Sequence, residues 1–126
     1  ISEGVLMDNY VTFLAGIFRS VRFGASSAHG RANMIRFNYF SKAGAFSRDS
    51  SDGTYRVNVV EFEQAVKDLS RDLLVLQGIG DYQTVSDFVK QQGNVSDQLQ
   101  ADLDRLGAAR IPVDIVYKQG RSILGL

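Results

Sequence analysis

The sequence predicts a mainly α-helical, bundle-like segment of about five helices, with one small β-hairpin and an extended C-terminal piece. Three observations lead to this fold. Apolar residues recur at helical spacing in five segments, serine and glycine residues flank these segments, and an Asp-Gly turn separates two short strand-like runs. Because no Gly- or Pro-rich linker divides the chain, we expect residues 1–126 to form a single domain.

The first helix is predicted over residues 6–21, where apolar residues follow the i, i+3/i+4, i+7 spacing. Gly24 is its expected stop. Three further apolar residues, Met7, Val11 and Phe18, widen the apolar stripe to about 160°. A stripe this broad is typical of a helix that packs against more than one neighbour.

A second helix is predicted from Ser26 or Ser27, either of which can cap it, to about Ala43, with Gly44 closing it. A β-hairpin should follow, in which residues 45–47 and 54–60 flank a turn at residues 49–53.

Helical spacing returns in the rest of the chain. Helices are predicted over residues 62–76 with a stop at Gly78, over residues 82–89 with a stop at Gly93, and from the cap Ser96 to Leu106 with a stop at Gly107. Residues 112–117 should be extended because Pro112 breaks a helix. Residues 118–126 show no periodicity.

Composition excludes several classes of function. The chain has no cysteine and one histidine, which rules out a disulfide scaffold, a thiolate zinc site, a cysteine nucleophile and a site with two imidazole ligands. No apolar run approaches the ~18 residues that span a bilayer, and no signal segment is visible, so we expect a cytoplasmic location and no membrane partner. Because the chain starts at Ile1 rather than methionine, we expect it to be a fragment or a processed product.

Charge is unevenly distributed along this formally neutral chain. Residues 9–48 contain no Asp or Glu but six basic residues, and eight of the thirteen aromatic residues lie there. Such a segment can bind an anionic partner, or its basic face can pack on the acidic remainder of the protein. The six basic residues are Arg19, Arg22, Arg31, Arg36, Lys42 and Arg48.

The second predicted helix carries the residues best suited to chemistry. At about 100° of rotation per residue, His29, Asn33 and Arg36 fall within about 60° of one another. An imidazole, an amide and a guanidinium on one face can bind a peptide carbonyl, a carboxylate or a phosphate. A neutral imidazole can also donate to a developing oxyanion. Structural roles remain open too: His29 can be an ordinary satisfied residue, and Arg36 can form a buried ion pair with a later aspartate.

Other motifs are weaker. The carboxylate pairs Glu61/Glu63 and Asp102/Asp104 are spaced i, i+2 and so point to different helix faces, which predicts solvated residues. The short glycine-containing runs lack the features of a nucleotide-binding loop, and there is no HExxH motif.

Two runs, residues 13–24 and 27–33, resemble the C-terminal region of the dipeptidyl peptidase III family of zinc metallopeptidases. They are similar to the branch found in bacteria and, fused to a Nudix domain, in plants. Later pieces that fit this resemblance are residues 42–46, 52–55, 77–82 and 111–115. The Ala-His element at residues 28 and 29, with the preceding Arg-Phe-Gly, is its most specific part.

This resemblance implies a function. Family members remove dipeptides from the N-termini of short peptides, and they bind zinc through an HExxGH-type helix and a later Glu-Glu-x-x-Ala-Asp-type helix. Neither motif is present here, so we expect no cofactor and no activity in this chain alone, and zinc in the full-length parent. The rest of the parent polypeptide and a peptide substrate are the expected partners; nucleic acid is not.

The resemblance also implies residue roles. The family's histidine in the Ala-His element contacts the substrate carbonyl, and it matches His29, which becomes the expected catalytic residue. Four positions later the family has a peptide-binding arginine, where this chain has Asn33. Arg36 lies one turn further along the same face and can substitute for it. We therefore expect Asn33 and Arg36 to bind substrate.

Two alternatives stay open. The chain can be a non-enzymatic helical interaction module that binds an anionic partner through residues 9–48. It can also be a structural cap that closes the helical lobe of its parent.

Overall fold

The computed structural model describes residues 1–114, 118 and 120–125. Helices account for 68% of the described residues, which confirms the mainly helical prediction. The helices are α1 (Glu3–Val21), α2 (Ala28–Lys42), α3 (Val59–Ile79), α4 (Tyr82–Gln92), α5 (Asp97–Ala108) and α6 (Arg121–Leu124). The strands β1 (Phe46–Arg48) and β2 (Tyr55–Val57) pair antiparallel, with Phe46 opposite Val57. Within this described part, no helix is long and apolar enough to cross a membrane.

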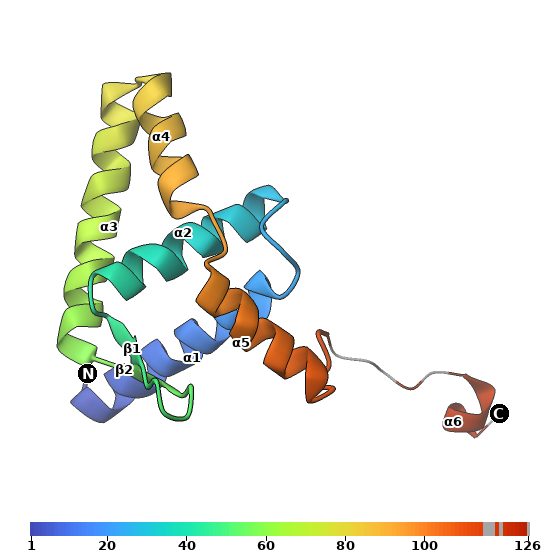
Figure 1. Cartoon of the computed structure of the whole chain (residues 1–126). Coiled ribbons are helices and arrows are strands. Elements are labelled where there is room, and N and C mark those ends of the chain that lie inside the picture. Colours follow the sequence, from blue (N-terminus) through green and yellow to red (C-terminus); the bar gives the residue numbers. More distant parts are fainter. Residues whose placement is uncertain (115–117, 119, 126) are drawn as a thin grey trace.

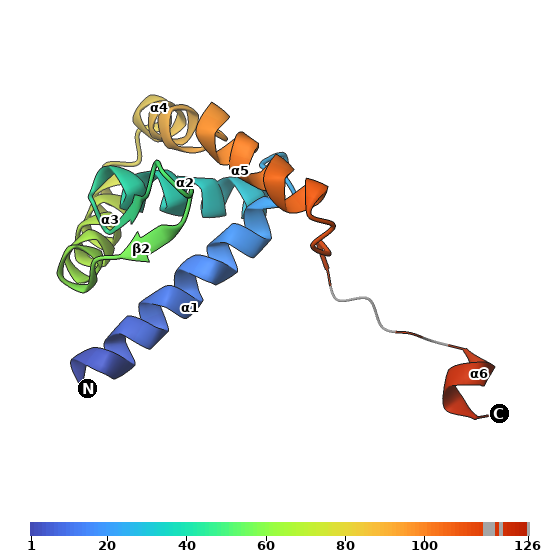
Figure 2. The ribbon, with the colours of Figure 1, turned by 60° about the horizontal axis from the view of Figure 1, so that its bottom comes forward.

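Helix α2 lies at the centre of the arrangement (Figure 1). Helix α1 packs along it, and α3 and α4 form an antiparallel hairpin, both arms of which contact α2. Turning the molecule shows α1 diverging from the other helices toward its N-terminal end, and α6 lying apart from them (Figure 2). The centre of α2 therefore has neighbours on several sides, whereas the first turns of α1 have few.

Local capping determines where the helices begin. The side chain of Ser27 accepts a hydrogen bond from the backbone N–H of Gly30, and that of Ser96 accepts one from Leu99. Both residues were predicted as caps, and both predictions are confirmed. Ser2, Asn58 and Asp81 cap α1, α3 and α4 in the same way.

Several predicted boundaries are wrong. The second strand was expected to reach residue 60, but Asn58 accepts a hydrogen bond from the N–H of Glu61 and starts α3 at Val59. Gly78 and Gly107 lie inside helices. The α3 helix ends instead at Gly80, whose φ of 66° is the left-handed conformation that glycine favours.

The structure describes only part of the C-terminal piece, residues 112–117, that was predicted to be extended. Pro112, Val113 and Asp114 belong to no helix or strand, and residues 115–117 of the expected extended piece lie outside the described residues. Helix α6 occupies part of the stretch in which no periodicity was found.

Aromatic side chains of residues 9–48 pack within and around the core, together with aliphatic residues of the same segment. Six of the eight aromatic residues in this segment are buried or half-buried, so most of them form core rather than an exposed binding face. Phe40 lies 4.9 Å from Phe62 between ring centroids, and Phe37 lies 5.0 Å from Phe46. These contacts hold α2 against α3 and β1.

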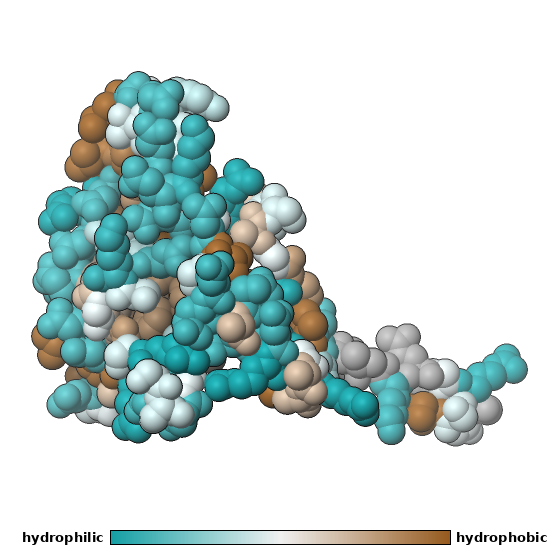
Figure 3. Space-filling view, viewed as in Figure 1, coloured by the Kyte–Doolittle hydropathy of each residue, from teal (hydrophilic) through white to brown (hydrophobic). Residues whose placement is uncertain are grey.

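Apolar residues also remain on the surface. Figure 3 shows an apolar patch along one side of the far end of the α3–α4 hairpin, beside hydrophilic surface, and Leu74, Ile79 and Tyr82 of this hairpin are exposed.

Candidate functional site

The three predicted site residues lie in a row along α2. His29 stands in the first turn and is exposed, Asn33 is half-buried, and Arg36 is exposed. Arg36 Nη1 donates a hydrogen bond of 3.0 Å to Asn33 Oδ1. With a rise of about 1.5 Å per residue, His29 precedes Asn33 by about 6 Å and Arg36 by about 10 Å along the helix axis. The structure thus joins Asn33 to Arg36 and leaves the imidazole of His29 without a hydrogen-bond partner among the described residues.

The first turn of α2 is fixed by backbone contacts on both sides of His29. Ser27 Oγ accepts a hydrogen bond of 3.0 Å from the N–H of Gly30. A Cβ atom at position 30 would overlap the carbonyl oxygen of Gly24, which itself has a φ of 89°. Only glycine permits this close approach of the preceding loop. This role of Gly30 was not predicted, although a glycine directly after the histidine is a usable signal.

The interpretation of Arg36 as a buried ion-pair partner is wrong. Its side chain is exposed, and no carboxylate of the described residues lies within ion-pair distance of it. A guanidinium held at one edge by Asn33 keeps further N–H donors directed outward. Arg36 is therefore available to an external acceptor.

A hollow of about 450 Å³ adjoins Arg36 and lies between α1 and α3; we call it the α1–α3 groove. It is mostly apolar, with Phe40 of α2 among its lining residues. The side chains that define it further are Tyr10 and Phe13 of α1, Arg36 of α2, and Val66, Leu69 and Leu73 of α3. The predicted row therefore ends at an apolar groove.

A second polar cluster joins the β-hairpin to α5. Arg48 Nε and Nη2 donate hydrogen bonds of 2.7 and 2.8 Å to the two carboxylate oxygens of Asp102, and the Tyr55 hydroxyl donates one of 2.6 Å to Asp102 Oδ2. Asp102 is only 5% exposed, so the prediction that it is solvated is wrong. Glu61, Glu63 and Asp104 are exposed as predicted.

The titration of this second cluster follows from its contacts. The hydrogen bonds from Arg48 lower the pKa of Asp102 to about 2, because they stabilise the charged carboxylate. Burial raises the pKa of the Tyr55 hydroxyl, and its hydrogen bond to Asp102 raises it further. The cluster thus stays an ion pair with a neutral phenol at ordinary pH.

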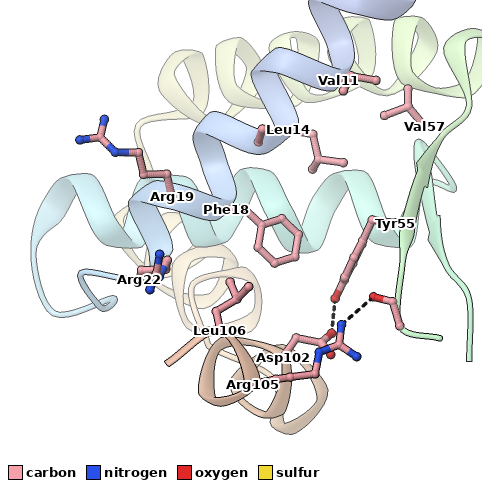
Figure 4. A pocket seen from close by; sticks show the side chains of 12 residues that line it. Val11, Leu14, Phe18, Arg19, Arg22, Tyr55, Val57, Asp102, Arg105 and Leu106 are labelled. Carbon is pink, nitrogen blue, oxygen red and sulfur yellow. Dashed lines mark hydrogen bonds between the residues drawn. The ribbon is translucent and has the colours of Figure 1, made fainter. Parts of the chain in front are cut away.

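Tyr55 and Asp102 of this cluster line a pocket of about 440 Å³ between α1 and α5 (Figure 4). Leu14, Phe18 and Leu106 supply apolar walls. Arg105 donates hydrogen bonds of 3.2 Å to the carbonyl oxygens of Asp52 and Gly53. Among the described residues, every buried side-chain nitrogen or oxygen has a hydrogen-bond partner. The polar groups here stabilise the fold and leave little capacity for a ligand.

Several cations of residues 9–48 also have partners within the chain. Arg19 forms an ion pair of 2.7 Å with Asp114, and Arg22 donates to the carbonyl oxygens of Ile111 and Pro112. Arg19 pairs with Asp114 and Arg48 pairs with Asp102. For these two arginines, the prediction that the basic segment packs on acidic residues of the remainder is confirmed.

The residues that the structure describes do not by themselves form a zinc site. In the described part of the structure, no three His, Cys, Asp or Glu side chains lie close enough together to hold a metal ion. The full sequence offers one histidine and no cysteine.

The chain is similar in sequence and fold to two proteins of known structure. No family model matches the chain. Dipeptidyl peptidase III from Caldithrix abyssi matches 84% of it with 38% identity and a TM-score of 0.77, and the enzyme of the same name from Corallococcus sp. strain EGB matches 86% with 36% identity and a TM-score of 0.77. The chain therefore resembles the C-terminal region of dipeptidyl peptidase III. It spans 20% of each of those dipeptidyl peptidase III chains.

A curated relative carries a different name. Nudix hydrolase 3 of Arabidopsis thaliana is 36% identical over 115 residues, which is 91% of this chain and 15% of that protein. Its name denotes another enzyme family than dipeptidyl peptidase III. The match covers so little of the relative that its named activity is not transferred to this chain.

Proposed function

We propose that this chain is the C-terminal part of the helical catalytic lobe of a zinc-dependent exopeptidase of the dipeptidyl peptidase III type. The observation that carries the proposal is the similarity of this chain to two such enzymes, with 36–38% identity and a TM-score of 0.77. Within this similar fold, His29 is exposed at the start of the central helix α2. The zinc ligands would lie outside this chain.

His29 is the proposed catalytic residue of the segment. Its ring N–H donates a hydrogen bond to the oxygen of the scissile carbonyl, and this bond strengthens as negative charge develops on that oxygen. The Ser27 cap and the contact between Gly24 and Gly30 hold the first turn in place before the substrate arrives. Such preorganisation lets the donor act without reorganising during the reaction.

Asn33 and Arg36 are the proposed substrate-binding residues. Arg36 lies about 10 Å beyond His29 along the helix axis, which is about three residues of an extended peptide at ~3.3 Å per residue. The guanidinium can donate hydrogen bonds to a carbonyl or carboxylate oxygen of the peptide while Asn33 holds its orientation.

The test is the substitution His29→Ala in the full-length parent. Loss of one oxyanion donor lowers kcat by about 10²–10³. Steady-state kinetics with a short peptide, together with zinc content by mass spectrometry, measures both effects. We expect the zinc content to stay unchanged, because the proposed zinc ligands lie outside this chain.

Two further variants make the test specific. His29→Gln keeps an N–H donor and should recover part of the lost kcat. Lys42→Gln changes an exposed residue in the last turn of the same helix and should leave kcat unchanged. An unchanged kcat in His29→Ala, or a loss of zinc, would contradict the role given to His29.

A further inference from the structure

The α1–α3 groove exposes apolar side chains on both of its walls. Phe13 on α1 is 41% exposed, and Val66 and Leu73 on α3 are 36% and 42% exposed. On α3, Val66, Leu69 and Leu73 follow the i, i+3, i+7 spacing of a helix-packing ridge. The ridge faces α1 across a hollow of about 450 Å³, so the two helices do not close on each other there.

Helix α1 shows more apolar surface than its neighbours cover. Its apolar stripe is about 160° wide. In the described structure α1 contacts α2, α3 and β2, yet Val5 and Val11 remain 51% and 47% exposed along with Phe13. Phe13 lines the α1–α3 groove, whereas Val11 lines the pocket toward α5, so the Phe13 side of the stripe is the part that lacks a neighbour at this groove.

The chemistry of the groove favours a helix as that neighbour. Both walls are helices, whose backbone N–H and C=O groups are already paired within each helix. An extended strand laid in the groove would find no backbone partners and would bury its own polar groups unpaired. A helix satisfies its own backbone and needs only an apolar stripe to fill the groove.

We propose that the α1–α3 groove binds an amphipathic helix from the rest of the parent polypeptide. This inference rests on the proposed function. This chain spans 20% of each of the two dipeptidyl peptidase III chains. The other four-fifths of such a protein can supply the helix that fills the groove. Because Arg36 belongs both to the groove and to the His29 row, the docked helix lies beside the row and forms a second wall of the substrate site.

Cysteine labelling in the full-length parent tests the docking. Leu73→Cys and Val66→Cys place a thiol in the groove, and Gln64→Cys places one on the opposite, exposed face of α3. Since this chain has no cysteine of its own, mass spectrometry of its peptides reports each introduced thiol alone. We expect a maleimide to label both groove positions at least about tenfold more slowly than position 64, because labelling then requires local opening.

Each outcome decides the proposal. Equal labelling rates at the three positions overturn the proposal. Protection of the groove that is lost on dilution also overturns it, because the occupant would then be a second copy of the protein. Slow labelling that is independent of concentration supports it. The readout needs no activity: a groove that labels freely alongside a slow His29→Ala enzyme refutes the docking alone, and a protected groove alongside an unaffected His29→Ala enzyme refutes the proposed function alone.

Discussion

The His29 row on α2 and the cluster of Arg48, Tyr55 and Asp102 are built from similar groups but differ in exposure. Each contains an arginine that donates to a side-chain oxygen, at 3.0 Å in the row and 2.7 Å in the cluster. His29 and Arg36 at the two ends of the row are exposed, whereas Asp102 is buried and accepts hydrogen bonds on both oxygens.

This difference in exposure indicates that the row is suited to binding a ligand and that the cluster stabilises the fold. A buried charge must be fully paired, and once paired it has little left to offer a ligand. An exposed imidazole or guanidinium contributes little to the fold and keeps its donors for a substrate. The variants below should therefore divide cleanly: changes in the cluster affect stability, and changes in the row affect catalysis.

The largest effect on stability is expected for Asp102→Asn. The amide keeps the shape but removes the negative charge, which leaves the partly buried Arg48 without its counter-ion. Breaking such a pair costs about 3–5 kcal/mol, and we expect about 3 kcal/mol because Arg48 keeps 24% of its side chain exposed. Urea denaturation measures this loss.

The matched control in the row is His29→Ala, which should change the free energy of unfolding by less than about 0.5 kcal/mol. A comparable loss of stability in both variants would remove the distinction between the two regions.

Acid should weaken the cluster. Because the folded pKa of Asp102 is lowered to about 2, its stabilising effect is present above the ordinary carboxyl range and is lost as the pH falls through about 2. The shift corresponds to about 2 kcal/mol of unfolding free energy. The free energy of unfolding should be measured by denaturation at about pH 4.5 and at about pH 2, for the unmodified protein and for Asp102→Asn. The decrease between the two pH values should be smaller in Asp102→Asn by this amount, because the variant has no carboxylate to protonate at position 102. Equal losses in the two proteins would contradict the assignment.

The smallest effect on stability is expected for Arg36→Gln. Its hydrogen bond to Asn33 is exposed, so the free energy of unfolding should change by less than about 0.5 kcal/mol. In the parent enzyme the same change should raise KM for a short peptide while kcat falls much less than in His29→Ala. An unchanged KM would show that Arg36 does not bind substrate.

Local signals in the sequence were enough to predict most of the helices. The caps Ser27 and Ser96 act within three residues, and helical spacing alone places His29, Asn33 and Arg36 on one face, where Asn33 and Arg36 are hydrogen-bonded. The end of the second strand was missed because an asparagine cap overrode two β-branched residues that favour strands.

Contacts between distant residues could not be predicted in this way. The sequence pattern relates Asp102 only to its neighbour Asp104, whereas its partner Arg48 lies 54 residues earlier in the chain. The α1–α3 groove was missed for the same reason, since its walls come from separate helices. Only the unusual breadth of the apolar stripe on α1 indicated that this helix has additional neighbours.

The close approach of Gly24 to Gly30 also limits how the protein can change. In a saturation library, position 30 should tolerate no side chain without displacing the turn that carries His29, because the obstruction is main chain rather than a movable side chain. The reach of the histidine is thus set by the length of the loop between α1 and α2. Insertions or deletions within residues 22–27, rather than point substitutions, are the route by which evolution or an engineer would reposition it.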